Sequence, residues 1–259
     1  MHKRLVEYTY IQRRTTSEVG SKGKLVRQVR EFEAYPVKFE GRHRHVLSLI
    51  KKDGVPVSEA QLEQNRLYAA KEMEKAEYEE IAPAPATNDA NKYITAGIGI
   101  GASGEGVWLG VSQFLRHCQF EAPRLTPLNG RETLALALHS CDGQLATPNE
   151  SYLRQLIGIV WIDLADKVVV RLEAWPGSNT LSPAEILAAR PADEVIVYEQ
   201  QLVREEMWAP QRIRLNGIGK GRLFNGVDKD MIFEFVDYKH FSTEIKEKDI
   251  TEPIKKPRG

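Results

Sequence analysis

Charge of one sign and long hydrophobic runs are missing from this sequence, and each absence excludes a class of protein. The 36 Lys and Arg residues balance the 36 Asp and Glu residues, so the formal net charge is zero. A neutral chain has no overall basic field that would attract nucleic acid, and we expect no nucleic-acid partner. No apolar run approaches the ~20 residues that a membrane-spanning helix needs.

Cysteine is also rare, with only Cys118 and Cys141 in 259 residues. Two cysteines are too few for a disulfide framework or for a four-cysteine zinc site. One disulfide and two thiols both remain open. We favour two ordinary buried thiols, because a β domain of this length has enough hydrophobic core without a covalent link.

The N-terminus has no readable targeting signal. Residues 1–7 carry charge, but no apolar segment follows them as it would in a signal peptide. Read literally, this start predicts a cytosolic chain. A chain whose signal peptide had been removed would begin in the same way, so the compartment needs other evidence.

What the sequence does contain is a long series of β-strand signals. Residues 8–16 and 25–35 are rich in β-branched and aromatic side chains, and the segment Gly20-Ser21-Lys22-Gly23 between them indicates a hairpin. Later strands are separated by the turn pairs Asn129-Gly130, Asp142-Gly143, Asn216-Gly217 and Asn225-Gly226. Strands and helices do not alternate as in a parallel sheet, so we expect a mainly β (α+β) antiparallel fold.

One predicted hairpin is apolar on both of its faces. Residues 159–163 and 168–175 flank the turn residues 164–166, and both sets of alternate positions are largely hydrophobic. Such strands are covered on both sides of the sheet. Further strands are expected at residues 45–50, 134–139, 195–204, 211–215 and 231–241.

Two helices are expected beside the sheet. Ser58 and Gln61 have the spacing of a capping box, which predicts a charged surface helix that runs to about Glu80. A second helix is predicted at residues 111–120 from apolar residues at helical spacing, namely Val111, Phe114, Leu115 and Cys118. The prolines of residues 82–89 exclude a helix or central strand there and indicate a loop.

Three patterns that can carry chemistry have simpler interpretations. The segment from Gly99 to Gly104 matches G-x-G-x-x-G, but it follows a proline-rich loop and not a strand of a βαβ unit, so we interpret it as a flexible glycine loop. His43 and His45 share a strand face, but two imidazoles do not make a zinc site. Asp142, Asp163 and Asp166 lie beside turns, where aspartate normally bonds the turn backbone. We therefore predict no enzymatic activity, no metal and no cofactor.

A set of short motifs follows one order along roughly residues 111–246. Gly158-Ile159-Val160-Trp161-Ile162-Asp163 and Val168-Val169-Val170-Arg171-Leu172-Glu173 form a G-x-x-W-I-D and v-x-R-l-E hairpin. An l-n-G-r-x-t turn precedes them at residues 128–133, a W-x-P-x-r step follows at residues 208–212, and a y-x-d-Y-r-x-F strand closes the set at residues 235–241. In these motifs the chain resembles the lipoprotein-carrier-like proteins of the LolA/LolB-like superfamily.

The resemblance implies a fold, a domain organisation and a location. The fold is a strongly curved antiparallel sheet or incomplete barrel, with covering helices and an apolar cavity between them. Residues 1–259 would form a single domain with a proline- and glycine-rich insertion at about residues 82–106. Members of the family work outside the cytoplasm and carry acyl chains or sense lipoproteins without catalysis. This implies a periplasmic or otherwise extracytoplasmic protein, with peripheral membrane contact.

We therefore expect a non-catalytic binding or carrier protein for an apolar ligand, such as a lipid or the acyl chain of a lipidated protein. The motive is the surplus of two-sided apolar strands together with the carrier-like motifs. The residues expected to line the cavity are Phe114, Leu115, Leu136, Trp161, Val170 and Phe235. The alternative is an envelope protein-interaction or sensor module whose core is filled by its own side chains.

Overall fold

The computed structural model describes residues 5–19, 24–39, 42–65, 67–68, 71, 97–100, 107–111, 114–115, 118–139, 154, 156–177, 180–189, 196–218 and 229–240. Most of these residues belong to one antiparallel sheet of eleven strands. Its strands are β1 (Tyr8–Val19), β2 (Leu25–Phe39), β3 (Arg42–Lys52), β4 (Val55–Pro56), β7 (Gln119–Leu128), β8 (Arg131–His139), β9 (Leu156–Asp163), β10 (Val169–Pro176), β11 (Ile196–Val203), β12 (Met207–Ile218) and β13 (Lys229–His240).

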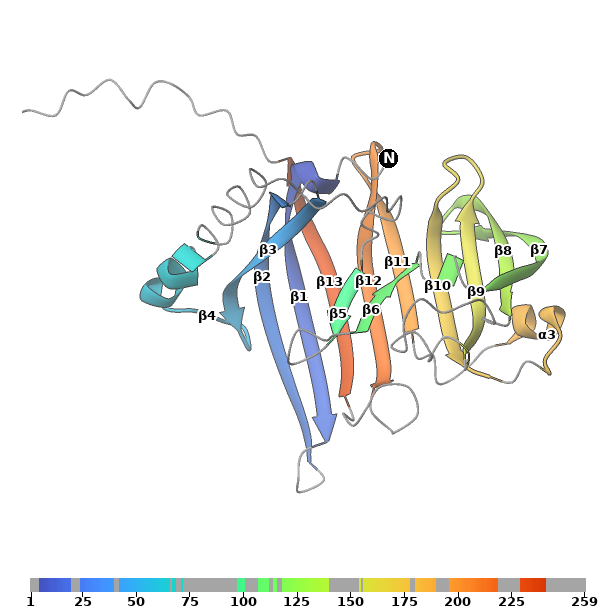
Figure 1. The fold of residues 1–259 in the computed structure, drawn as a ribbon, viewed down its shortest axis with the longest axis horizontal. Helices are drawn as coiled ribbons and strands as arrows, with labels where there is room; N and C mark the ends of the chain where they lie inside the picture. The colour runs from blue at the N-terminus through green and yellow to red at the C-terminus, as the bar shows by residue number, and fades with distance from the viewer. Residues whose placement is uncertain are drawn as a thin grey trace, which may run out of the picture.

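The strand order across the sheet is β4-β3-β2-β1-β13-β12-β11-β10-β9-β8-β7. Every step except β1–β13 joins strands that are consecutive in this sheet, so the sheet is a series of hairpins whose first and last strands pair in the middle (Figure 1). Strands β4 and β7 stand at opposite ends of the order and do not pair with each other. The sheet is therefore open, which confirms the predicted incomplete barrel.

Two predicted hairpins and one of the four predicted turn pairs are confirmed. The turn predicted at Asn216-Gly217 is wrong, because both residues lie within strand β12, and Asp142-Gly143 and Asn225-Gly226 lie outside the described residues. Residues of β1 pair in regular register with β2, from Tyr10 opposite Ala34 to Val19 opposite Leu25. The hairpin of β9 and β10 forms across the turn that follows Asp163. Between β7 and β8 the turn residues Asn129 and Gly130 both have positive φ, 52° and 77°, which is the backbone that an Asn-Gly hairpin turn requires.

The glycine-rich segment contains a second, smaller sheet. Strands β5 (Gly97–Ile100) and β6 (Val107–Gly110) pair antiparallel, with Gly99 opposite Trp108. The interpretation of Gly99 as part of a flexible loop is therefore wrong, because its backbone takes part in a strand pair. Residues 101–106, which complete the G-x-G-x-x-G pattern, lie outside the described residues.

The helix predicted after Ser58 is present in part. Residues 59–65, 67, 68 and 71 are helical, and the Ser58 hydroxyl accepts a hydrogen bond from the Gln61 N–H at 3.2 Å. The Gln61 side chain donates instead to the Asn65 amide oxygen at 3.0 Å. Ser58 is thus an N-cap, as predicted, while the reciprocal half of the capping box is replaced by a bond within the helix. The predicted end at Glu80 lies outside the described residues.

The helix predicted over residues 111–120 is shorter than expected. Residues 111, 114 and 115 are helical, and the Cys118 N–H donates to the Phe114 carbonyl at 3.0 Å, but strand β7 begins at Gln119. Sequence reasoning missed β7 because Pro123 and Pro127 lie in it. Proline is tolerated there because β7 is an edge strand, where one side of the backbone needs no ladder partner.

A short helix that was not predicted covers one face of the sheet. Helix α3 (Pro183–Ala188) begins at a complete capping box, in which Ser182 and Glu185 bond each other's backbone N–H groups. It packs against β8 and β9, at the end of the sheet opposite β4 (Figure 1). Its buried side chains Ile186 and Leu187 contact the sheet there.

Two hydrophobic clusters lie on opposite faces of the sheet, as strand β9 shows. Leu156, Val160 and Ile162 belong to one cluster, whereas Ile157, Ile159 and Trp161 belong to the other. Successive residues of a strand point to opposite faces, so the two clusters are separated by the sheet. We call the face under α3 the outer face and the other one the inner face. The predicted two-sided apolar hairpin is confirmed.

Candidate ligand-binding face

The inner face carries one continuous hydrophobic cluster that extends from β8 to β2. It contains buried residues of eight strands together with Phe114, and the partly buried Leu5, Val111 and Cys118 pack against it. Its buried members include Tyr10, Ala34, Leu138, Val160, Leu172, Tyr198, Ile213, Leu215, Phe233 and Phe235. We call this set the inner cluster. No other described set of hydrophobic residues is as extensive, which makes this face the candidate for binding an apolar ligand.

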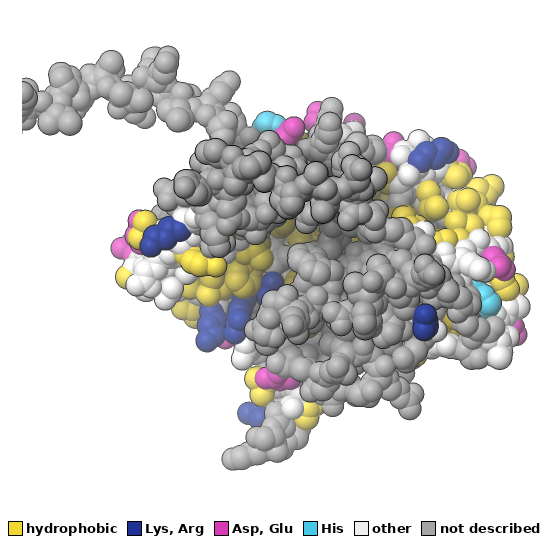
Figure 2. Space-filling view, in the orientation of Figure 1, with side chains coloured by type: hydrophobic (Ala, Val, Ile, Leu, Met, Phe, Trp, Pro, Cys, Tyr) yellow, Lys and Arg dark blue, Asp and Glu magenta, His cyan; other side chains and the backbone are white. Residues whose placement is uncertain are grey.

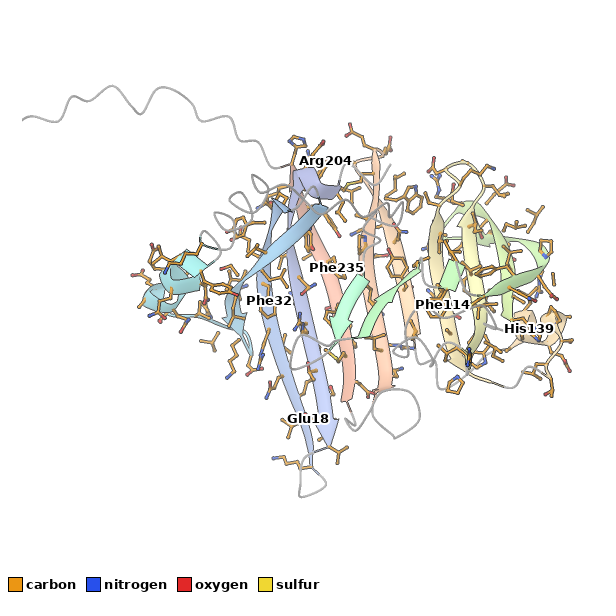
Figure 3. All side chains as sticks on the ribbon, in the orientation of Figure 1. Glu18, Phe32, Phe114, His139, Arg204 and Phe235 are labelled. Atoms are coloured by element: carbon orange, nitrogen blue, oxygen red, sulfur yellow. The ribbon has the colours of Figure 1, made fainter. Side chains whose placement is uncertain are left out.

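Three of the predicted cavity residues meet on this face. Phe114 is 2% exposed and Phe235 is 4% exposed, and both belong to the inner cluster (Figure 3). Leu136 is partly buried against the same cluster. Phe114 comes from the helical turn after β6, while the other two come from β13 and β8. The structure therefore brings together residues that are far apart in the sequence.

The other three predicted residues lie elsewhere. Leu115 is 47% exposed, because it follows Phe114 on a different side of the helical turn. Trp161 packs against the outer cluster, so the sheet separates it from Phe114 and Phe235. Val170 is buried but belongs to neither cluster, and it lies at the register shift between Val169 and Arg171. Alternation alone did not reveal these positions because both faces of β9 and β10 are apolar.

Tyrosines dominate the inner face where β1 meets β13. The ring of Tyr10 lies 5.3 Å from the ring of Tyr238 and 5.7 Å from that of Phe235. Burial raises the pKa of the Tyr10 and Tyr238 hydroxyls, so both stay neutral. The Tyr238 hydroxyl donates to the Pro210 carbonyl at 2.6 Å, which fixes β13 to β12. This part of the face is aromatic, and the rings of His45 and His240 lie 4.8 Å from Tyr10 and 5.3 Å from Tyr8.

A guanidinium lies next to these aromatic rings. Arg14 is on the same side of β1 as Tyr8 and Tyr10 by strand alternation, and its guanidinium carbon is 5.2 Å from the Phe32 ring and 5.1 Å from the Phe233 ring. Figure 3 shows Phe32 on β2 beside β1. Sequence reasoning missed this residue. The signal was present in the alternation of residues 8–14, where Arg14 shares a face with two tyrosines.

Arg14 has few polar partners. Its Nη2 donates to Gln12 Oε1 at a long 3.4 Å, and its buried Nε has no hydrogen-bond partner. Its pKa is lowered, first because burial disfavours the charged form and second because of the positive charge of Arg30. An arginine nevertheless stays protonated in proteins. The inner face therefore holds one half-buried positive charge beside its apolar cluster.

The outer face of the same strands has a different pattern, a row of charges that alternate in sign. Arg13 Nε lies 3.0 Å from Glu31 Oε1, and Lys51 Nζ lies 3.0 Å from Glu31 Oε2. The row continues across the sheet in register through Glu234, Arg212, Glu199 and Arg171. It ends where the Arg171 guanidinium lies 5.9 Å from the Trp161 ring. The basic residues named here each oppose a glutamate on a neighbouring strand.

Several of the carrier-like motif residues meet in one polar cluster at the turn between β9 and β10. Arg131 bonds Asp163 through Nε at 2.5 Å and Nη2 at 3.1 Å, and its Nη2 also reaches Asp166 at 2.8 Å. The Trp208 indole N–H donates to Asp166 at 2.9 Å, and the Arg131 guanidinium is 5.3 Å from the Trp208 ring. The hydrogen bond from Arg131 lowers the pKa of the Asp163 carboxyl.

This polar cluster is structural, as the sequence predicted for the turn aspartates. Asp163 accepts hydrogen bonds from the backbone N–H groups of Ala165 and Asp166, at 3.0 and 2.8 Å, and so fixes the turn. A carboxylate held by a guanidinium is a poor general base, because its pKa is lowered further from neutral pH. Asp142 lies outside the described residues.

The histidines, acids and cysteines of the described residues were the candidates for metal binding and redox chemistry. They contain no group of three or more His, Cys, Asp or Glu residues placed to hold a metal ion. The His45 ring N–H donates to the Tyr8 carbonyl at 3.1 Å, and the side chain of His43 lies outside the described part. Cys118 is disulfide-bonded, so our preference for two thiols is wrong. The only other cysteine of the sequence is Cys141.

Among known proteins, similarity to this chain was found only in solved structures. No protein-family model matches the chain, and no curated protein is similar to it. Over 96% of its length the chain is similar to 92% of an outer-membrane lipoprotein-sorting protein domain from Vibrio parahaemolyticus, with 10% identity and a TM-score of 0.40. It is similar over 92% of its length to 90% of a DUF1329 family protein from Desulfovibrio piger, with 8% identity and a TM-score of 0.37. Over 91% of its length it is similar to 87% of a LolA superfamily protein from Nitrosomonas europaea, with 8% identity and a TM-score of 0.32.

Proposed function

We propose that this chain is a non-catalytic binding or carrier protein whose inner face holds an apolar ligand, such as a lipid or the acyl chain of a lipidated protein. The observation that carries the proposal is the continuous inner cluster on an open sheet. Among the described residues, only Leu5, Val111, Phe114 and Cys118 pack on the cluster from outside the sheet.

The binding energy would come from removing alkyl groups from water. Each methylene that an acyl chain buries contributes about 0.8 kcal/mol, so a partly enclosed chain reaches micromolar affinity after the cost of association. Asp163 and Asp166, at the turn after β9, are already bonded to Arg131. This favours a binding function over catalysis for the described part of the chain.

We further propose that the protein works outside the cytoplasm and forms a single domain. The disulfide of Cys118 supports the location, because disulfides persist in oxidising compartments. Pairing of β1 with β13 along ten residue pairs supports the single domain, because it joins the first and last strands of the sheet. In the described part of the chain, no helix is both long enough and apolar enough to cross a bilayer.

The test is to purify the protein without detergent, extract it for lipid mass spectrometry, and titrate the delipidated protein with a fluorescent fatty acid. We expect co-purified lipid and saturable binding. Phe114→Asp places a charge in the inner cluster and should weaken binding at least tenfold, because burying an unpaired charge beside the ligand costs more than the ~1.4 kcal/mol of a tenfold change.

Leu115→Asp is the matched control. It introduces the same charge one residue along the chain, on a side chain that is 47% exposed, and should leave affinity unchanged. Circular dichroism of both variants separates lost binding from lost folding. Absence of both co-purified lipid and saturable binding would favour the interaction or sensor module with a filled core. Equal effects of the two substitutions would mean that Phe114 does not border the site.

A further inference from the structure

Two arginines face each other on the inner side of the sheet. Arg14 of β1 and Arg30 of β2 are direct cross-strand partners, and both lie on the face that carries the inner cluster. Each bonds only a glutamine two residues earlier on its own strand, Gln12 for Arg14 and Gln28 for Arg30. In the described part of the chain neither guanidinium pairs with a carboxylate. Two like charges are therefore placed opposite each other, with no counterion among the residues that the structure describes.

The outer face shows that this arrangement is an exception. One residue earlier on β1, Arg13 opposes Glu31 of β2 and Glu234 of β13, and it forms ion pairs with both, at 3.0 and 3.8 Å. The same two strands thus neutralise their charges on one face and concentrate positive charge on the other. Like charges directly opposite each other destabilise a sheet, so the inner pair is unfavourable in the ligand-free protein.

Neither arginine can escape this cost by losing its proton. Guanidinium groups remain charged at all physiological pH values, and the buried Nε of Arg14 lacks any hydrogen-bond acceptor. The rings of Phe32 and Phe233 compensate in part through cation–π contacts. Glu18, the nearest carboxylate on this side of β1, is four residues further along the strand, or about 13 Å by strand rise.

The pair is continuous with the apolar face. Phe233, which contacts the Arg14 guanidinium, is 1% exposed and belongs to the inner cluster. On the other side, Arg30 is exposed and its partner on β3 is Lys52, so positive charge extends toward solvent. Figure 2 shows basic side chains beside hydrophobic ones in the region of β1 and β2. Positive charge and an apolar surface therefore adjoin at Arg14.

We propose that Arg14 and Arg30 bind the anionic headgroup of an amphiphile whose alkyl chain lies along the inner cluster. This inference rests on the proposed function and adds the chemical class of the ligand, a phosphate- or carboxylate-bearing lipid. A phosphate or carboxylate supplies acceptors for the free N–H groups of both arginines and removes their mutual repulsion. The guanidinium fork suits these planar or tetrahedral oxygen groups better than an ammonium would.

The experiment compares three probes on the delipidated full chain by isothermal titration calorimetry. Dodecyl phosphate has both the chain and the anion, dodecanol has only the chain, and inorganic phosphate has only the anion. All are used below the concentration at which they aggregate. Each is titrated into the wild type, Arg14→Met, Arg30→Gln and the outer-face control Arg13→Gln, which changes the net charge by the same amount as the inner substitutions.

We expect dodecyl phosphate to bind most tightly, and each inner-face substitution to weaken it by about tenfold or more, the size of one charge-assisted hydrogen bond. Dodecanol affinity should change less than about twofold in all variants, and Arg13→Gln should behave as wild type. Added salt should weaken only the anionic probe. Arg30→Gln keeps the test decisive if Arg14→Met fails to fold, because Arg30 is exposed.

Each contrary outcome has a distinct meaning. Equal affinity for dodecanol and dodecyl phosphate, unaffected by Arg30→Gln, would overturn the headgroup site and leave the proposed function standing. Tight binding of inorganic phosphate alone would show an anion site that does not recognise an amphiphile, which also overturns the inference. Absence of binding by all three probes would overturn the proposed function and this inference together.

Discussion

Arg131 and Asp163 form a two-point ion pair between β8 and β9, with Nε–Oδ2 and Nη2–Oδ1 distances of 2.5 and 3.1 Å. The Asp163 side chain is 1% exposed, and it also accepts the two backbone N–H groups of the following turn. One carboxylate therefore joins a strand, its neighbour and a hairpin turn. The Asp of the W-I-D motif and the Arg of the N-G-R motif are separated by 32 residues in sequence but act as one unit.

Asp163→Asn should destabilise the protein by ~1–3 kcal/mol, because it removes one of the two carboxylates that Arg131 contacts and weakens both turn hydrogen bonds. Urea denaturation followed by circular dichroism measures the change. Asp166→Asn is the control, because Asp166 is partly exposed and should cost less. Equal losses for the two variants would mean that burial of Asp163 adds nothing to the pair.

The same pair predicts how stability depends on pH. The hydrogen bond from Arg131 lowers the folded-state pKa of Asp163 below its unfolded value of about 3.9. A lowered carboxyl pKa stabilises the folded protein above the unfolded pKa, and this stability is lost as the pH falls toward the folded pKa. The stability difference between wild type and Asp163→Asn should be constant above about pH 5 and shrink below about pH 4. A constant difference down to about pH 3 would contradict the pair.

The glycine of the G-x-x-W-I-D motif has a packing role. Gly158 of β9 lies opposite Ala174 of β10, and a Cβ at this position would overlap the Glu173 carbonyl oxygen and approach the Ala174 Cα to 3.0 Å. Gly158→Ala should therefore push the two strands apart and cost ~1–3 kcal/mol. Chemical denaturation measures this loss.

Gly130 provides the contrast. It has a φ of 77° and open space around its would-be Cβ, so its requirement is conformational. Asn adopts this backbone more readily than other residues with a side chain, so Gly130→Asn should cost well under 1 kcal/mol. If Gly158→Ala were as mild as Gly130→Asn, the close approach of β9 and β10 would not exist in solution.

The disulfide of Cys118 predicts a redox-dependent stability. Cys118 precedes the edge strand β7 and packs against the inner cluster, so its bridge ties this end of the sheet. A bridge that closes the loop to Cys141 should stabilise by about 3 kcal/mol in the chain-entropy model. Thermal unfolding with and without reductant measures the difference, and Cys118→Ser should melt like the reduced wild type. Equal melting of the oxidised and reduced protein would contradict the bridge.

How much the sequence could predict depended on whether the signal was local. The Asn129-Gly130 turn and the Ser58 N-cap were predicted correctly, because each rests on the chemistry of adjacent residues. The same Asn-Gly pair at residues 216–217 predicted a turn wrongly, because strand β12 continues through it. Strand β7 was missed because Pro123 and Pro127 argue against a strand. Only its position at the sheet edge, a long-range property, makes them acceptable.

In the candidate site, too, local sequence signals were read correctly and long-range properties were not. Phe114, Leu136 and Phe235 were recognised as apolar, and they do meet on one face. Trp161 was grouped with them because β9 is apolar on both sides, so its sequence does not distinguish the face toward α3 from the inner face. The side of β1 on which Arg14 lies could be predicted from alternation, but its pairing with Arg30 appears only in the register of β1 with β2.

The arginine pair finally predicts a conflict between stability and binding. Arg14→Met keeps an apolar side chain against Phe32 and Phe233 but removes the unsatisfied Nε and the repulsion from Arg30. The lost cation–π contacts offset part of this gain. We expect the free energy of unfolding of the lipid-free variant to rise by about 1 kcal/mol, which corresponds to roughly 2–4 °C in Tm, although its affinity for dodecyl phosphate falls.

Arg13→Met is the control. It breaks the outer-face pairs with Glu31 and Glu234 and should instead be neutral or destabilising. Differential scanning calorimetry of the delipidated proteins decides between the two. A Tm of Arg14→Met several degrees below wild type would show that the aromatic contacts hold Arg14 for the stability of the fold and not for a ligand.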